Sequence, residues 1–310
     1  MLPIHSARTR RALAAAGLTG AVLLTATACG SSSGGQSGMS QSMGNPAGSA
    51  GSTPSAMAAT PGGSMPGMGD MASGDGLAAE ASGLRFAPAA TSLPAKRASV
   101  FRFQIRAADG MPVTSFQPDQ TKLMHLYLIR SDLTGFQHVH PTMASDGTWT
   151  ANLAGTPAGS YRVYTSFITP VGGMNTPLVL SQPVTVPGTA ATVPLPPAAT
   201  STTVDGYTLT VSGDKLMAGM THMLTVTVSK DGKPVTDLQP YLDTYAHLTA
   251  FRAGDQAFAH LHPQGSVNGD HGGPALSFEA TLPKSGNWRL FLQFQTAGTL
   301  HTAAMTITVG

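Results

Sequence analysis

The sequence predicts an all-β protein in which two tandem immunoglobulin-like β-sandwich domains follow a signal peptide and a disordered tether rich in Met, Gly and Ser. Three observations support this fold class. Glycine and proline are abundant, with 36 and 23 residues in a chain of 310, whereas only 10% of residues are charged. This balance favours short strands and turns. No segment after the signal repeats apolar residues at the helical period, and the chain contains a long internal repeat.

The repeat is clearest where residues 109–141 align without a gap to residues 231–263, with 14 of 33 positions identical. The similarity resumes downstream, where Gly-Ser-Tyr-Arg-Val-Tyr from Gly159 matches Gly-Asn-Trp-Arg-Leu-Phe from Gly286. A unit of roughly 100 residues is too long for a solenoid repeat and has the size of one β-sandwich domain. We therefore place repeat 1 at residues 81–188 and repeat 2 at residues 189–310, with the joint in the Pro/Ala/Thr-rich segment 187–200.

Strands are expected where β-branched and aromatic residues cluster between turn signals. An Asp-Gly turn follows the first strand of each repeat, and a hairpin comes after it. The expected strands of repeat 1 are 100–106, 124–129, 136–140 and 161–167, and those of repeat 2 are 222–228, 246–251, 256–262, 288–294 and 303–309.

The first 29 residues resemble a bacterial lipoprotein signal peptide. Three arginines precede an apolar stretch at 12–24 that is short for a bilayer span, and Ala26-Thr27-Ala28 precede Cys29, the only cysteine. We expect Cys29 to carry a lipid that holds the exported protein at the outer face of the cytoplasmic membrane. The alternative is a cleaved signal and a secreted protein. The Arg10-Arg11 pair also resembles a twin-arginine signal, so the export route stays open between Sec and Tat.

Charge excludes one class of partner. Beyond the signal, 14 basic residues (17 minus the three arginines of the signal) face 15 acidic ones. No clustered positive charge remains to neutralise phosphates, so nucleic acid is not expected as a partner.

Residues 30–80 are read as a disordered tether because they are mostly Gly, Ser, Ala, Pro and Met and hold too little apolar surface to offset chain entropy. Met65, Met68 and Met71 are bunched near its end. Thioether sulfur is a soft ligand that suits Cu(I). These three methionines are therefore candidate Cu(I) ligands, although compositional drift in a low-complexity segment explains them equally simply.

The pattern His-x12-His-x-His-Pro occurs once in each repeat and carries the functional prediction. We expect each hairpin to place the first histidine opposite the second, with the third two residues further along the same strand. Residues with this spacing share one face of a sheet. Imidazole is a frequent ligand of copper and zinc, so each repeat is expected to hold one three-histidine metal site. The six candidate ligands are His125, His138 and His140 in repeat 1 and His247, His260 and His262 in repeat 2.

Three imidazoles leave a coordination position open. In repeat 2 the additional ligand is expected to be His301, with His271 and His222 as further candidates, whereas repeat 1 has no further histidine. Copper is the expected ion and zinc the alternative, because divalent copper binds such sites more tightly and because of the methionines in the tether.

The pattern Gly-x-Pro-Val-x-x-x-Gln-Pro, followed by His and His-x-His-Pro, resembles an actinobacterial group of secreted or lipidated proteins, and the resemblance covers both repeats. The chain is also distantly similar to the CopC and YtkA-like copper-handling β-sandwiches of bacterial envelopes. This second resemblance implies copper binding or delivery, with an envelope copper protein as a partner. The N-terminal ligand of CopC-type proteins has no counterpart here, since Cys29 would be the mature terminus.

Two functions from different classes follow. The first is a non-enzymatic cell-envelope lipoprotein that sequesters or delivers copper. The second is a structural or adhesive immunoglobulin-like module whose histidines are scaffolding. No catalytic Ser/His/Asp arrangement is evident, and Glu80 and Glu279, the only glutamates, form no recognisable catalytic pair.

Overall fold

A computed structural model describes residues 74–310, and all the regular secondary structure in this range is β-strand. The all-β prediction is therefore confirmed. The predictions for earlier residues, namely the signal peptide, Cys29 and the methionines Met65, Met68 and Met71, concern residues outside the described range. No helix within residues 74–310 has the length and hydropathy needed to cross a bilayer.

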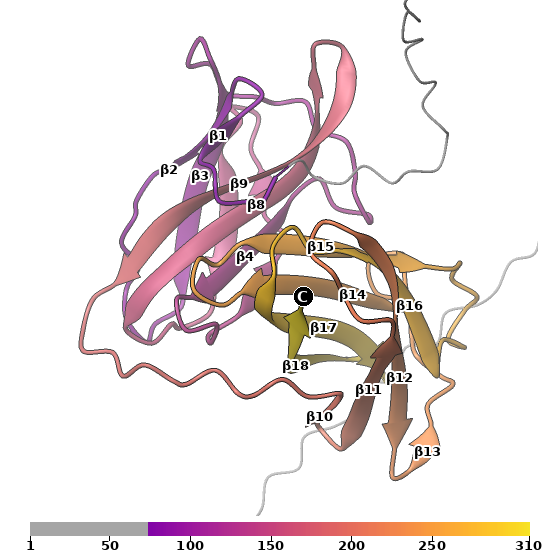
Figure 1. The fold of residues 1–310 in the computed structure, drawn as a ribbon. Coiled ribbons are helices and arrows are strands. Elements are labelled where there is room, and N and C mark those ends of the chain that lie inside the picture. The colour runs from indigo at the N-terminus through magenta and orange to yellow at the C-terminus, as the bar shows by residue number, and fades with distance from the viewer. Residues whose placement is uncertain (1–73) are drawn as a thin grey trace, which may run out of the picture. The chain divides into compact units, whose positions relative to one another are not determined.

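Repeat 1 folds into two antiparallel sheets, one with the order β1-β2-β3-β7-β6 and one with the order β5-β4-β8-β9. Figure 1 labels β1, β2 and β3 of the first sheet and β4, β8 and β9 of the second. This arrangement corresponds to the immunoglobulin order ABED over CFG, with β5 as an added strand beside strand C. The immunoglobulin-like prediction is confirmed by this topology. The strands are β1 (Glu80–Ala81), β2 (Leu84–Pro88), β3 (Ser99–Ala107), β4 (His125–Arg130), β5 (Gln137–Val139), β6 (Thr142–Met143), β7 (Trp149–Leu153), β8 (Gly159–Val171) and β9 (Met174–Val186).

Repeat 2 has the corresponding strands, but its two layers are joined into one hydrogen-bonded path, β10-β11-β12-β16-β15-β14-β17-β18. The joint is β15, whose first half pairs with β14 and whose second half pairs with β16 (Figure 1). The strands are β10 (Ser201–Val204), β11 (Tyr207–Gly213), β12 (Thr221–Lys230), β13 (Lys233–Pro234), β14 (Ala246–Arg252), β15 (Phe258–Gln264), β16 (Ala275–Thr281), β17 (Gly286–Thr296) and β18 (Thr299–Val309).

Burial along the strands shows which sheet faces are covered. In β3, Phe101, Phe103 and Ile105 are buried while Arg102 between them is exposed, as expected for a sheet with one wet face. In β4 and β14, by contrast, residues on both faces are buried. These two strands therefore lie between two apolar layers.

The covering layer is an apolar cluster that joins the two repeats. Tyr127, Ile129 and Tyr164 of repeat 1 pack with Phe251 and Phe258 of repeat 2. Each repeat also has a core of its own, centred on Trp149 in one and Trp288 in the other. The repeats thus share a third core, and the first histidine of each pattern, on β4 or β14, is adjacent to it.

The hairpin of repeat 2 differs from the prediction by two residues. His247 was expected opposite His260, but the residue opposite His260 is Thr249. The loop is longer than the expected tight turn, because the N–H of Arg252 donates to the carbonyl oxygen of Ala257 at 2.8 Å. The pairing centre consequently moves one residue along the chain.

The hairpin of repeat 1 shows the same shift, with His138 opposite Tyr127 instead of His125. Its loop includes Gly135 in the left-handed region, with φ 65°. Side chains alternate with a period of two, so a two-residue shift keeps every side chain on its predicted face. The three histidines of each pattern therefore still share a face.

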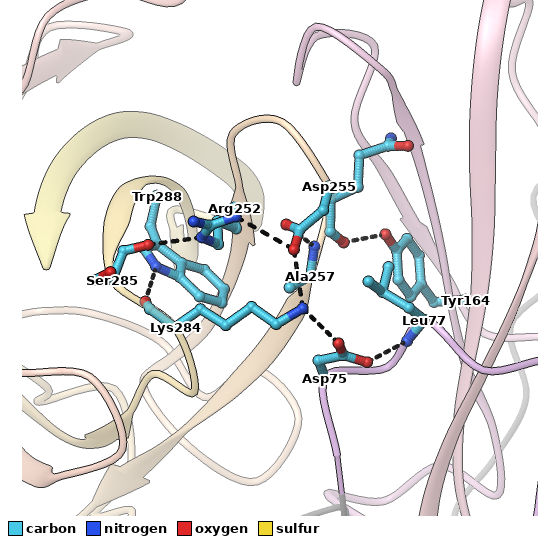
Figure 2. Close-up of polar contacts among 10 residues, drawn as sticks. Asp75, Leu77, Tyr164, Arg252, Asp255, Ala257, Lys284, Ser285 and Trp288 are labelled. Carbon is cyan, nitrogen blue, oxygen red and sulfur yellow. Dashed lines mark hydrogen bonds and ion pairs between the residues drawn. The ribbon is translucent and has the colours of Figure 1, made fainter.

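The start of the described chain is held at Lys284, as Figure 2 shows. The Lys284 ammonium lies 2.6 Å from the Asp75 carboxylate and 2.9 Å from that of Asp255, and its hydrogen bond lowers the pKa of Asp75. The N–H of Phe258 also donates to the Asp75 carbonyl oxygen, and Leu77 packs against the core of repeat 2. The tether was expected to extend to residue 80, but residues 75–80 already contact the folded repeats.

We expect Lys284→Gln to lower the free energy of unfolding by about 1 kcal/mol, because two partly exposed ion pairs that solvent screens are lost together. Cleavage near Asp75 in limited proteolysis should also become faster. Lys233→Gln is the matched control, since Lys233 is exposed on β13 and no ion pair involving it is found in residues 74–310. Equal stability and equal cleavage in the two variants would contradict this role of Lys284.

Candidate metal centre

The six predicted histidines form one contiguous cluster that both repeats build. The rings of His125 and His247, from different repeats, are stacked with centroids 5.6 Å apart and planes 3° apart. The ring centroid of His138 lies 4.6 Å from that of His247, and the ring centroid of His247 lies 4.6 Å from that of His260. The two histidine faces, expected to form one separate site in each repeat, therefore meet in the structure, because the shared core brings them together.

His125, His138 and His247 form the centre of the cluster. One nitrogen from each ring lies within 4.8 Å of the other two, and Nδ1 of His125 is 3.0 Å from Nε2 of His138. Nitrogens bound to one copper or zinc ion at about 2.0–2.1 Å lie roughly 3.3 Å apart in tetrahedral geometry. The spacing of these nitrogens is thus compatible with a shared ion.

The outer nitrogen of each central ring faces an oxygen that can only accept. Nε2 of His125 donates to the carbonyl oxygen of Asp119 at 3.0 Å, Nδ1 of His138 to Oε1 of Gln293 at 2.6 Å, and Nδ1 of His247 to Oε1 of Gln120 at 2.7 Å. A neutral imidazole has a single N–H. With the outer N–H groups so engaged, the inner nitrogens of His125 and His138 present lone pairs to each other, whereas the inner nitrogen of His247 lies 3.0 Å from the Tyr127 hydroxyl.

The amide of each glutamine is oriented with its oxygen toward a histidine ring. Oε1 of Gln293 faces His138, and its Nε2 lies 3.4 Å from Oγ1 of Thr302, a hydroxyl that can accept from it. The two glutamines act reciprocally across the repeats, because Gln293 of repeat 2 orients His138 of repeat 1 and Gln120 of repeat 1 orients His247 of repeat 2.

Sequence reasoning missed both glutamines. Gln293 is the cross-strand partner of His247, but Ser166 occupies the corresponding place beside His125. The internal repeat therefore gave no signal for Gln293. Tyr127, also missed as a site residue, approaches the inner nitrogen of His247 with its hydroxyl at 3.0 Å and can donate to that lone pair.

Two further histidines carry ring nitrogens without a partner. Nε2 of His140 and Nε2 of His260 are buried, and neither makes a hydrogen bond to any group of residues 74–310. The His140 ring lies 5.0 Å from that of His125, and His260 stacks at 5.1 Å on His262 at the outer end of the cluster. An unpaired buried polar group is costly, so these nitrogens are candidates for additional ligands.

Burial keeps the imidazoles neutral. It lowers the pKa of His125, and it lowers the pKa values of His138, His247 and His260 far below the ordinary value. It also lowers the pKa of His140 to about 3. Neutral imidazole is the form that binds metal ions, so these five rings are in the binding form at neutral pH.

His301, expected as an extra ligand, makes other contacts. Its Nδ1 lies 2.8 Å from the Asp205 carboxylate and its Nε2 lies 2.9 Å from Oγ1 of Thr296. Both ring nitrogens are therefore engaged away from the cluster.

A cavity of about 510 Å³ reaches one side of the cluster. His260 and His262 line it from repeat 2, and Asp119 and Ser166 line it from repeat 1. The centre is more enclosed, since His125 and His247 have no exposed surface. An ion from solvent would therefore meet His262 and His260 first.

Comparisons with known proteins describe the family and leave its function open. A family model described as "Domain of unknown function (DUF8832)" matches residues 79–177 and again residues 202–310. The comparison with curated proteins found no match.

Solved structures that resemble the chain include a Salmonella alpha-2-macroglobulin (12% identity, 74% of this chain and 15% of that chain, TM-score 0.25) and the Escherichia coli adhesin FdeC (16%, 77% and 65%, TM-score 0.23). The tandem Ig repeats of Dlar are similar at 11% identity, with 73% of this chain and 97% of that chain covered and a TM-score of 0.20. Because these TM-scores are low, the immunoglobulin-like assignment rests on the strand order of the sheets and not on these structures.

Proposed function

The chain belongs to the family described as Domain of unknown function (DUF8832), and we propose that its two domains together bind a transition-metal ion, copper before zinc, in the histidine cluster between them. The role is non-enzymatic, as a cell-envelope protein that sequesters or delivers the ion. The lipid anchor at Cys29 and export to the outer face of the cytoplasmic membrane are part of this proposal, and they depend on the N-terminal sequence alone.

The observation that carries the proposal is the orientation of the three central imidazoles. One nitrogen of each ring lies within 4.8 Å of the other two, and the lone pairs of His125 and His138 face each other at only 3.0 Å, while the outer N–H groups donate to oxygens. Lone pairs at this distance repel unless a cation or a proton lies between them. The inner nitrogen of His247 contacts the Tyr127 hydroxyl, which an ion would displace. Hydrogen bonding of the outer ring nitrogen is also the usual arrangement for histidines that bind metals.

The donor set favours copper over zinc. Nitrogen ligands bind divalent copper more tightly than zinc, and the single cysteine of the chain, Cys29, is far in sequence from the cluster. The methionines of the tether are compatible with Cu(I), which would permit delivery to a partner copper protein in the envelope. A three-nitrogen set with open positions fits an ion that is handed on.

We expect the purified exported protein to take up one Cu(II) ion in the central cluster. The histidine pattern of the sequence alone predicts one ion in each repeat. Elemental analysis after dialysis gives the stoichiometry, and electron paramagnetic resonance should show coupling to three imidazole nitrogens. His271→Ala is the control, because His271 is exposed and outside the cluster. Absence of uptake would reject the proposal.

A second function, a structural or adhesive module, is favoured by the aromatic core between the repeats. Phe136 and Phe291 stack across it with centroids 4.2 Å apart, and this packing needs no ion. In that case the histidines only fill the interface and hydrogen-bond to Tyr127 and the glutamines. Thermal stability that chelators leave unchanged, together with no metal uptake, would support this function.

A further inference from the structure

Three metal-ligating side chains of different chemistry form a row across adjacent strands of repeat 2. His262 of β15 lies directly opposite Glu279 of β16 in the strand pairing. Glu279 in turn lies directly opposite Met223 of β12. Direct partners project from the same face of a sheet, with Cβ atoms about 4.5–5.5 Å apart. The row was not visible in the sequence, because its members come from three separate strands.

The row lies on the face of the sheet turned away from the core of repeat 2. Leu224 and Phe278, the next residues of β12 and β16, alternate to the opposite face and are buried. On the face of the row, the hydroxyls of Thr221 and Thr281 meet at 2.8 Å, which shows that side chains of direct partners are in reach of each other here.

The chemistry of the row suits copper in both oxidation states. Imidazole and carboxylate suit Cu(II), and thioether suits Cu(I). The side chain of Met223 is 48% exposed although methionine normally fills apolar gaps. No ion pair or side-chain hydrogen bond of Glu279 is recorded among residues 74–310. The carboxylate therefore stands between two potential ligands, and no cation of residues 74–310 pairs with it.

The row is continuous with the buried cluster. His262 stacks on His260 at 5.1 Å, and His260 lies 4.6 Å from the ring of His247. Both His260 and His262 also line the 510 Å³ cavity. A continuous series of neighbouring side chains therefore leads from the surface to the cluster, in the order Met223, Glu279, His262, His260 and His247.

We infer that Met223, Glu279 and His262 form a solvent-facing loading site for copper, from which the ion passes through His260 to the central cluster. This inference rests on the proposed function, since the cluster is the destination. Ligand exchange between neighbouring donors moves the ion without any change in its oxidation state, and the row binds more weakly than the three oriented imidazoles because it is exposed.

The test compares copper uptake by the metal-free exported protein and by the double variant Met223→Leu, Glu279→Gln. The matched control is Met220→Leu, Glu80→Gln, which removes another exposed methionine and the other glutamate of the chain. Stopped-flow absorbance after mixing with Cu(II) reports the rate. We expect the loading variant to be slower by about tenfold, the lower end of the effect of supporting groups at metal sites, with unchanged final stoichiometry. Equal rates in both variants would overturn the inference.

A second measurement separates the loading site from the cluster. With His125, His138 and His247 all changed to Ala, we expect weak residual binding of one Cu(II) by equilibrium dialysis, and its loss when Met223→Leu and Glu279→Gln are added. If this triple variant shows no residual binding, the loading site is overturned, but the proposal that the central cluster binds copper is not affected. A wild-type protein that takes up no copper would instead reject the proposed function, and the loading site with it.

Discussion

Replacing His247 with Ala in repeat 2 is expected to remove the metal ion from the histidines of repeat 1. The central set contains two rings of repeat 1 and one of repeat 2, so the loss of one ligand reaches the whole centre. We expect copper affinity to fall by at least about 100-fold, since even groups that only orient a ligand contribute about 10- to 100-fold. Competition with a chelator of known affinity measures the change.

Two comparisons make this result specific to a shared centre. Changing Gln293 to Leu leaves all six histidines in place and removes only the acceptor of His138, so a smaller loss of about 10- to 100-fold is expected. Changing His262 to Ala alters the outer end of the cluster and should leave equilibrium affinity close to that of wild type. If His247→Ala retained an ion with wild-type affinity in repeat 1, two independent sites would be present instead.

Acid is expected to destabilise the metal-free protein steeply below pH 6.5. In the folded state burial keeps the pKa values of His247 and His260 well below 6.5, the value expected for an unfolded chain. As the pH falls through 6.5 the unfolded chain gains protons that the folded chain does not. Each such group lowers the free energy of unfolding by about 1.4 kcal/mol per pH unit, or about 3 kcal/mol per unit for both.

Urea unfolding at pH 7.5, 6.5 and 5.5, with a chelator present, measures this dependence. Stability should be constant above pH 6.5 and decline down to the depressed pKa values of the folded state. The double variant His247→Leu, His260→Leu lacks both titrating groups and should show a shallower decline. A slope that is the same in wild type and variant would mean that other groups cause the acid sensitivity.

Sequence reasoning was sound where a local period decides the outcome. The β-rich composition, the duplicated hairpins and the spacing of the histidines all reflect side-chain alternation with a period of two. The histidines of each repeat therefore share a face even though the predicted register was wrong by two residues at both hairpins. A shift of one residue would have separated them.

The composition of the centre could not be predicted in the same way. Gln293 and Gln120 are distant in sequence from the histidines they orient, and neither has an equivalent in the other repeat. His301 was grouped with the cluster because it is a histidine near the last strand, whereas its place on β18 pairs it with Asp205. Such contacts depend on how separate elements pack, and no local spacing encodes them.

The sequence by itself determined that this protein is a duplicated β-sandwich and that each copy carries three histidines on one sheet face, because alternation along a strand is a local property. Only the tertiary structure decided that the two faces meet. The aromatic residues beside the histidines, Tyr127 and Phe258 among them, bury themselves in a core between the repeats, and this burial joins the two histidine sets into one centre. The burial of apolar surface between elements far apart in the chain is a property of the folded whole, so the shared centre exists only there.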